Sequence, residues 1–182
     1  EWRSALDAKQ LTLVFASAYL DNPGSMYGHT LLRVDAADQD ERTRLLAYSI
    51  SFAAATDESN GLIFAVKGLF GGYPGVFATL PYYLKVREYS DLENRDLWEY
   101  ELDLSPEELE RVLRHAWELL PAYFEYYFFD ENCSYHLLAL LQVARRDLEL
   151  TAPFRLWALP VDTVRALTDQ PGLVKRIVYR PA

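Results

Sequence analysis

A single cysteine, Cys133, places the strongest limit on how this chain of 182 residues can fold. One cysteine cannot form an internal disulfide, and it excludes a four-cysteine zinc site and an iron–sulfur cluster. The fold must therefore be held by a buried apolar core, which a chain of this length can build in one domain. Apolar residues make up 51% of the chain and charged residues 25%, and this composition excludes disordered and fibrous proteins.

The negative charge of the chain is concentrated in one segment. The net charge is −9, and residues 88–110 contain ten acidic residues and one basic residue, Arg95. The rest of the chain is neutral on balance, so we expect one acidic face or edge. No stripe of lysine and arginine is present, and we therefore do not expect a nucleic acid as a partner. The neutral remainder is compatible with contact to a membrane surface.

No segment has the pattern of a membrane-spanning helix or of a signal peptide. The longest apolar stretch without a charge, residues 68–84, contains four glycines and two prolines and is too short to span a bilayer. Glu1 is not followed by the basic and apolar regions of a signal peptide. The wider segment 61–89 is compatible with a hairpin or broken helix on the core, or with a mobile flap over a hydrophobic substrate site. Its end, residues 82–89, is expected to be a strand.

Hydrophobic patterns predict an α+β fold. Strands are expected at residues 11–20, 45–52, 96–104 and 173–179, and loops at 35–44 and 53–60. Residues 30–34 are expected to form another strand or a short helix-to-strand passage. Residues 21–25 (DNPGS) have the composition of a turn. No repeat, low-complexity tract or shift in composition divides the chain, so we expect one domain over residues 1–182.

A strong helix start lies at Ser105. This residue can cap a helix, Pro106 suits the first helical position, and Glu108 completes a capping box. His115 lies off the apolar stripe of this helix, and we treat it as a surface histidine. The stripe consists of Leu109, Val112, Leu113, Ala116, Trp117 and Leu120, and Pro121 ends the helix.

Two further helices are expected. One begins near Asn132 and is completed by Arg145 and Arg146, whose charges complement the C-terminal end of the helix dipole. Its buried stripe consists of Leu137, Leu138, Leu141 and Ala144. A shorter helix is expected at residues 160–169.

The segment Asp130–His136 (DENCSYH) concentrates the side chains capable of catalysis. Asn132 is a good N-cap, and it places Cys133 in the first turn of an apolar helix. The helix dipole and the free N–H groups favour a thiolate at this position, and the N–H groups could form an oxyanion hole. Asp130 and Glu131 would raise the pKa of the thiol, so a base is needed.

Two histidines are candidate bases for Cys133. His136 lies three residues further on the same helix face, but side chains lean toward the N-terminus and rarely meet well at this spacing. His29 follows a turn and precedes apolar residues, where it could be held rigidly opposite a helix terminus. We therefore prefer His29 and keep His136 as the alternative. From the residues alone, a buried structural cysteine is the alternative to a catalytic one.

Two motifs together resemble a known family. GSMYGHTLLR at residues 24–33, followed by ENCSYHLL at residues 131–138, is similar to the N-terminal periplasmic domain of Lnb-type bacterial lipoprotein N-acyltransferases. The order, a histidine first and an Asn-Cys pair later, also resembles permuted papain-like enzymes such as lecithin:retinol acyltransferase. The resemblance covers residues 11 to about 150. It implies a permuted papain-like domain with an antiparallel sheet packed against helices, Cys133 as the nucleophile and His29 as its base.

The papain-like pattern also implies a third polar group that orients the histidine. The strand after the histidine strand offers only Tyr48, Ser49 and Ser51, of which we choose Ser51. A second histidine, an aspartate or an asparagine is missing there, which departs from the pattern.

Other side chains near the two motifs are candidates for contacts with the substrate. They are Tyr27, close to His29, and Asn132, beside Cys133, although packing and capping explain both equally well. His136 belongs to the same group. Arg33 could hold a phosphate or a carboxylate, but a structurally paired arginine is the simpler interpretation.

The resemblance implies a ping-pong acyl transfer. Cys133 attacks an ester of a phospholipid, His29 protonates the leaving alcohol, and the acyl chain then passes from the thioester to the N-terminal amine of a lipoprotein. No metal ion or organic cofactor is needed. The implied location is the periplasm, at the cell envelope, with a membrane anchor in the full-length protein.

Two other functions are compatible with the sequence. A cysteine hydrolase, acting as a cell-wall peptidase, an amidase or a lipase, would use the same residues, and the apolar aromatic surface near the motifs favours a lipid substrate. A non-catalytic binding module is the second alternative, and it would be favoured if Cys133 and His29 lay beyond hydrogen-bond reach of each other.

Overall fold

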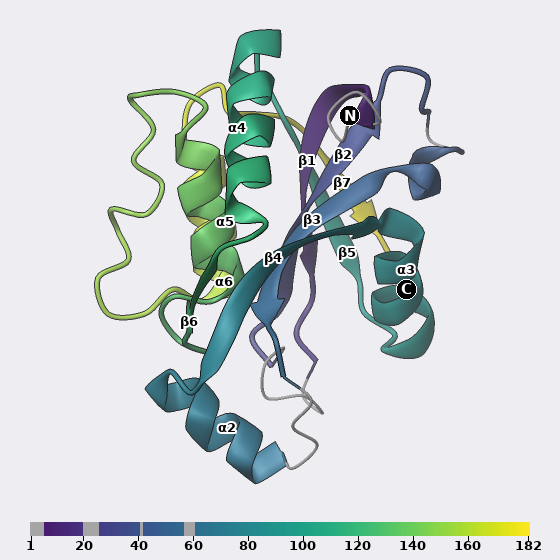
Figure 1. Ribbon diagram of the computed structural model, residues 1–182. Helices are drawn as coiled ribbons and strands as arrows, with labels where there is room; N and C mark the ends of the chain where they lie inside the picture. The colour runs from purple at the N-terminus through teal and green to yellow at the C-terminus, as the bar shows by residue number, and fades with distance from the viewer. Residues whose placement is uncertain (1–5, 20–25, 41, 57–60) are drawn as a thin grey trace.

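The computed structural model describes residues 6–19, 26–40, 42–56 and 61–182. Within these residues seven strands form one sheet in the order β6-β4-β3-β2-β1-β5-β7, and all neighbouring strands are antiparallel (Figure 1). The strands are β1 (Ala8–Ala16), β2 (His29–Ala36), β3 (Tyr48–Ala54), β4 (Tyr73–Pro81), β5 (Leu97–Leu102), β6 (Tyr123–Tyr126) and β7 (Val174–Arg180). The helices are α2 (Gly61–Phe70), α3 (Tyr82–Val86), α4 (Pro106–Leu119), α5 (Cys133–Gln142) and α6 (Pro160–Thr168), with a 3₁₀ turn η2 (Arg44–Leu46) and a π-helical segment η3 (Arg87–Leu92).

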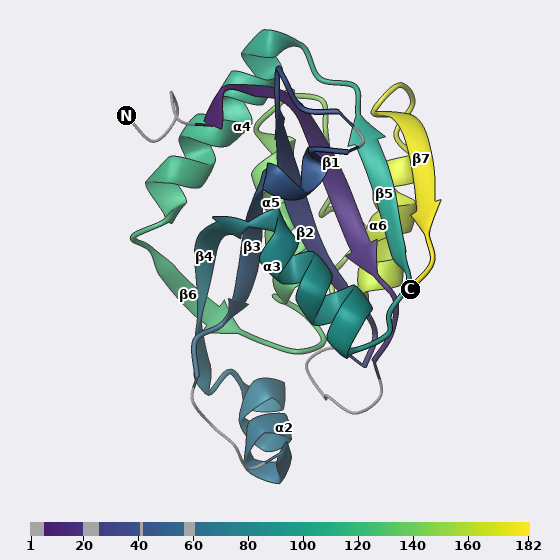
Figure 2. The ribbon, with the colours of Figure 1, turned by 90° about the vertical axis from the view of Figure 1, so that its right-hand side faces the viewer.

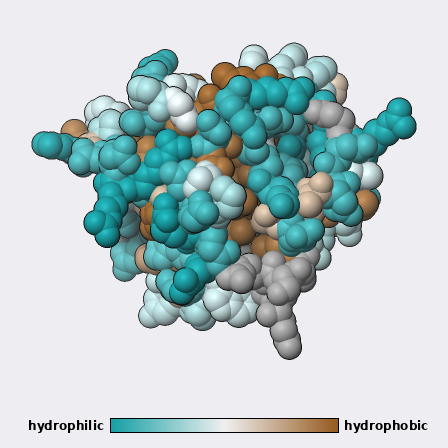
Figure 3. All heavy atoms as spheres, turned by 90° about the horizontal axis from the view of Figure 1, so that it is seen from above, coloured by the Kyte–Doolittle hydropathy of each residue, from teal (hydrophilic) through white to brown (hydrophobic). Residues whose placement is uncertain are grey.

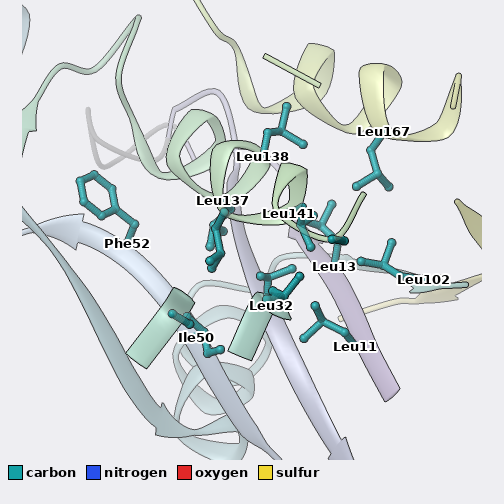
Figure 4. Close-up of a cluster of buried hydrophobic side chains, with 14 of the residues drawn as sticks. Leu11, Leu13, Leu32, Ile50, Phe52, Leu102, Leu137, Leu138, Leu141 and Leu167 are labelled. Carbon is teal, nitrogen blue, oxygen red and sulfur yellow. The ribbon is translucent and has the colours of Figure 1, made fainter. Parts of the chain in front are cut away.

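The main core lies between one face of the sheet and helices α4, α5 and α6. Strand side chains that point to this face meet α5 and α6 in the cluster shown in Figure 4. The labelled members are Leu11, Leu13, Leu32, Ile50, Phe52 and Leu102 from the sheet, Leu137, Leu138 and Leu141 from α5, and Leu167 from α6. Because helices flank α5 and the sheet covers its inner side, most of its residues are buried.

The opposite face of the sheet is covered by α3 and η3. In Figure 2, α3 lies in front of the sheet and α5 and α6 lie behind it. Side chains alternate along β2, so Leu31 faces this second cluster while Leu32 faces α5. The expectation of a strand at residues 82–89 is wrong. Tyr82, Val86 and Tyr89 recur at helical spacing and pack together on this face.

Most other sequence expectations are confirmed. Strands β1, β2, β3, β5 and β7 and helices α4, α5 and α6 all lie within the predicted segments or overlap them closely. The strand predicted at 11–20 ends already at Ala16, and the one predicted at 45–52 starts at Tyr48, because η2 occupies the preceding residues. The predicted turn at 21–25 lies outside the described residues.

Two expectations about the helices need correction. Trp117 does not belong to the buried stripe of α4, since 53% of the residue is exposed. Arg145 and Arg146 lie beyond the end of α5 at Gln142, and Arg145 instead pairs with Glu108 of α4 at 2.7 Å. The capping box at the start of α4 is present as predicted.

Segment 61–89 contains α2, β4 and α3 rather than a hairpin or one broken helix. In Figure 1, α2 projects from the lower end of the sheet. It carries one charged residue, Lys67. None of the helices that the structure describes is long and apolar enough to cross a membrane.

Candidate active site

Cys133 is the first residue of α5, and only 1% of it is exposed. The helix begins here because Asn132 caps it: the side-chain oxygen accepts hydrogen bonds from the N–H groups of Ser134 at 3.0 Å and Tyr135 at 3.2 Å. The amide nitrogen of Asn132 donates to the carbonyls of Phe128, at 3.1 Å, and Ala158. Asn132 therefore fixes the position of Cys133 as a helix cap.

His29 is the first residue of β2, and it is brought to the same end of the sheet as the start of α5. Its ring donates a hydrogen bond to the sulfur of Cys133. Burial, the largest effect, raises the pKa of the thiol, and the charge and hydrogen bond of His29 act against it. The N–H of Thr30 and the hydroxyl of Ser134 also favour the thiolate, and the pKa is lowered to about 6.

Gly28 leads the chain into this position. Its φ is +96°, a conformation that residues with a side chain rarely adopt. A Cβ atom here would lie 2.5 Å from the ring of Phe15 on β1. The glycine before His29 is therefore required both by the backbone and by the neighbouring strand.

A second contact joins β2 to α5. The hydroxyls of Thr30 and Ser134 lie 2.8 Å apart in the interior, and the Ser134 hydroxyl is 3.7 Å from the sulfur of Cys133. Because this pair connects segments that are 104 positions apart, it aligns the strand of His29 with the helix of Cys133.

Two buried tyrosines complete the surroundings of the thiol, and sequence reasoning missed both. The hydroxyl of Tyr126 lies close to Cys133, whose backbone and thiol both act on the pKa of this tyrosine. The ring of Tyr89 lies 5.8 Å from the ring of His29. Burial, together with the negative charge of the thiolate, raises the pKa of both tyrosines well above the usual value. The sequence holds no local signal for Tyr126, because β6 is a four-residue strand at the edge of the sheet.

His136 faces the core and is not brought to the thiol. Its ring lies 4.0 Å from the ring of Phe52 and 5.0 Å from that of Phe124. Burial lowers its pKa to about 4, so the ring is neutral. Among the described residues, no hydrogen-bond partner faces its Nε2 atom.

Arg33 is paired within the structure on the sheet face opposite α5. Its guanidinium lies 2.8 Å from Glu99 and 2.7 Å from Asp35, and it stacks over the ring of Tyr82. Glu99 also approaches Arg180 at 3.4 Å and is only 2% exposed. Glu99 therefore does not contribute to the acidic face expected of residues 88–110, because it is buried among cations.

The two remaining candidates lie apart from the pair. Ser51 is buried on β3 opposite Ala78 of β4, and no hydrogen bond joins it to His29 in the described part of the chain. Its orienting role stays a prediction. Tyr27 is partly exposed, and its ring packs edge-on against Phe129 at 5.4 Å. No three His, Cys, Asp or Glu side chains gather for metal binding within residues 6–19, 26–40, 42–56 and 61–182.

The chain is similar to one protein family and to one solved structure. The family model of the Lnb N-terminal periplasmic domain matches residues 1–170. Among solved structures, the crystal structure of the type VI secretion system effector TseH is similar, with a TM-score of 0.56 and 12% identity over 95% of this chain and 98% of that chain. At this identity the likeness concerns the fold alone. The comparison with curated proteins gave no match.

Proposed function

The chain belongs to the Lnb N-terminal periplasmic domain family, and on this premise we propose that it is a thiol-dependent acyltransferase. It moves a fatty acyl chain from a phospholipid, through a thioester on Cys133, to the N-terminal amine of a bacterial lipoprotein. The family identifies the domain as periplasmic. The histidine strand precedes the cysteine helix, and we propose that the fold is a permuted papain-like one.

One observation carries this proposal: the hydrogen bond from His29 to a buried thiol whose pKa is lowered to about 6. A thiol without such a partner would be protonated in the interior, because burial disfavours the charge. The interactions that stabilise the Cys133 thiolate against burial are those that a catalytic nucleophile needs. It also counts against a non-catalytic binding module, which has no need of a hydrogen-bonded Cys–His pair.

In the first half-reaction the sulfur of Cys133 attacks the carbonyl carbon of the ester. The oxygen of the tetrahedral intermediate becomes negative, and we propose the N–H of Cys133 and the hydroxyl of Tyr126 as its hydrogen-bond donors. The bond to the glycerol oxygen then breaks, and protonated His29 gives its proton to that oxygen. The products are a lysophospholipid and a thioester on Cys133.

In the second half-reaction an amine replaces the alcohol. Neutral His29 takes a proton from the amine as its nitrogen attacks the thioester carbon. The C–S bond breaks, an amide forms, and the thiolate of Cys133 is restored beside protonated His29. Water in place of the amine would make the same site a hydrolase, which is the second candidate function.

The lipid substrate fits the position of α2, which we propose as the membrane contact. Exposed apolar side chains on this helix include Val66, Leu69 and Phe70, although a helix with so little charge is normally buried. The carbonyl of Gly68 accepts a hydrogen bond at 2.9 Å from Phe128, whose own carbonyl is bound by Asn132. Contact with lipid would thus hold the start of α5 near the bilayer. The opposite end of the molecule, seen in Figure 3, is mainly hydrophilic.

Intact mass spectrometry tests the proposed function. The chain and its Cys133→Ala and His29→Ala variants are incubated with phospholipid vesicles. We expect an acyl-sized mass gain on the wild type that hydroxylamine removes and that is absent from Cys133→Ala. A lipoprotein N-terminal peptide then distinguishes transfer from hydrolysis, because transfer yields an acylated peptide and hydrolysis a free fatty acid. A Cys133 that gains no acyl group and resists alkylation until the protein unfolds would overturn the proposal.

A further inference from the structure

An apolar cavity of about 290 Å³ lies beside the candidate active site. Its lining side chains are all aromatic or aliphatic: Tyr27, Phe129, Leu156, Trp157 and Leu159. Leu156 is 74% exposed and Trp157 is 61% exposed, so the structure leaves both apolar side chains open to solvent. We name this feature the 156–159 groove.

The groove is built from the segments that carry the reactive pair. Tyr27 lies two residues before His29, and Phe129 lies four residues before Cys133. The rings of Tyr27 and Phe129 pack edge-on at 5.4 Å and form one wall. The other wall is attached to the cap of α5, since the carbonyl of Ala158 accepts a hydrogen bond from the amide of Asn132. The groove is therefore held in a fixed position relative to the thiol.

The chemistry of the groove favours an apolar occupant over a peptide. A bound peptide needs hydrogen-bond partners for its backbone. The side chains here supply almost none, and both backbone groups of Ala158 are already used, the N–H by the carbonyl of Phe129 and the carbonyl by Asn132. A flexible apolar ligand has no donors or acceptors, so it gives up no hydrogen bonds with water when it enters the groove.

We propose that the 156–159 groove holds a single linear alkyl chain of the acyl donor, an inference that rests on the proposed function. At roughly 30 Å³ per methylene, similar to the volume of one water molecule, the cavity takes about ten methylene groups. Its position next to both motifs lets a chain extend from a carbonyl group at Cys133 into the groove. The exposed rim side chains, Leu156 and Trp157, then cover the bound chain.

A chain-length series tests this inference. p-Nitrophenyl acetate, butyrate, octanoate, decanoate and palmitate are used as acyl donors, and acylation of Cys133 is followed by intact mass and by release of p-nitrophenol. For the wild type we expect the second-order rate constant to rise by up to about fourfold per added methylene until the groove is filled, and then to level off. Leu156→Glu should lower the ratio of the decanoate rate to the acetate rate by about tenfold or more.

Leu46→Glu is the matched control, since Leu46 is 68% exposed and lies in η2, at the end of β3 opposite to α2. It should retain the full dependence on chain length. Trp157→Ala is a second groove variant at an exposed position and should also weaken the preference for decanoate. Acylation of Cys133 that is independent of chain length would overturn the groove while leaving the proposed function intact. Failure of every ester to acylate Cys133 would instead contradict the proposed function.

A binding measurement on Cys133→Ala separates the groove from the chemistry. A brominated decyl phosphocholine, kept below its micelle concentration, should quench part of the tryptophan fluorescence of this variant. The quenched part should disappear when Trp157→Phe is added. Quenching that is unchanged by Trp157→Phe would place the chain elsewhere and overturn the inference.

Discussion

The ring of His29, at the start of β2, donates a hydrogen bond to the sulfur of Cys133, at the start of α5. Since burial alone would raise the pKa of the thiol, the value of about 6 depends on this histidine. The thiolate is present above pH 6 and is lost as the pH falls below it. A free cysteine makes the same change near pH 8.5.

The first prediction concerns thiol reactivity. The rate of alkylation of wild-type Cys133 by iodoacetamide should have its midpoint near pH 6. In His29→Ala the midpoint should rise above that of a free cysteine, because burial remains and the cation is lost; at pH 7 the rate should fall by about tenfold or more. His115→Ala, which removes a surface histidine, should match the wild type. An unchanged midpoint in His29→Ala would contradict the pairing.

The second prediction concerns Tyr126, whose hydroxyl lies close to Cys133. Tyr126→Phe removes a donor near the developing oxyanion, so acylation by an ester should slow by about 100-fold. Alkylation does not pass through an oxyanion and should change much less. The two rates, measured on the same variant at pH 7, check this difference. An equal loss in both rates would assign Tyr126 to thiol activation instead.

Local signals in the sequence were sufficient to predict the structure where a segment determines its own conformation. The capping box at Ser105 and the cap at Asn132 were recognisable because each depends on residues within four positions. The pairing of Cys133 with His29 followed from the family resemblance and from the position expected of a base opposite a helix terminus.

The remainder of the site depends on contacts between distant segments. Tyr126 reaches the thiol only because β6 pairs with β4 at the edge of the sheet. The helical spacing of Tyr82, Val86 and Tyr89 was hidden by their neighbours, since aromatic and branched residues are also typical of strands. The 156–159 groove could not be predicted, because it forms only when the loop before α6 binds the cap of α5.

The third prediction concerns His136, whose pKa is lowered to about 4 by burial among aromatic rings. The unfolded chain binds a proton at this residue below about pH 6.5, whereas the folded protein does not. Its contribution to stability is therefore full above pH 6.5 and is lost as the pH falls toward 4. By pH 5 the loss amounts to roughly 2 kcal/mol.

His136→Phe should remove this part of the pH dependence and preserve the acylation of Cys133. Urea unfolding at pH 7 and pH 5 measures the first effect, and we expect the variant to exceed the wild type in stability at pH 5. Loss of acylation in a folded His136→Phe variant would indicate that His136, rather than His29, serves as the base.

The fourth prediction concerns membrane contact through α2. Leu69→Glu should weaken binding of the chain to phospholipid vesicles by about tenfold or more, since it removes an exposed apolar side chain and adds a charge at the interface. Leu46→Glu makes the same change at the other end of β3 and should leave binding unchanged. Vesicle flotation measures both variants. Equal loss in the two would argue that α2 is not the contact.

The fifth prediction compares the caps of two helices. Ser105→Ala removes an exposed cap of α4 and should lower the free energy of unfolding by about 1 kcal/mol. Asn132→Ala also removes the donor to the buried carbonyl of Ala158 and to the half-buried carbonyl of Phe128, so the loss should be about 3 kcal/mol. Urea unfolding gives both values. Because Asn132 holds the start of α5 in place, Asn132→Ala should also raise the midpoint of Cys133 alkylation, while Ser105→Ala should not. Similar losses and unchanged midpoints in both variants would mean that Asn132 is an ordinary cap with no part in positioning the thiol.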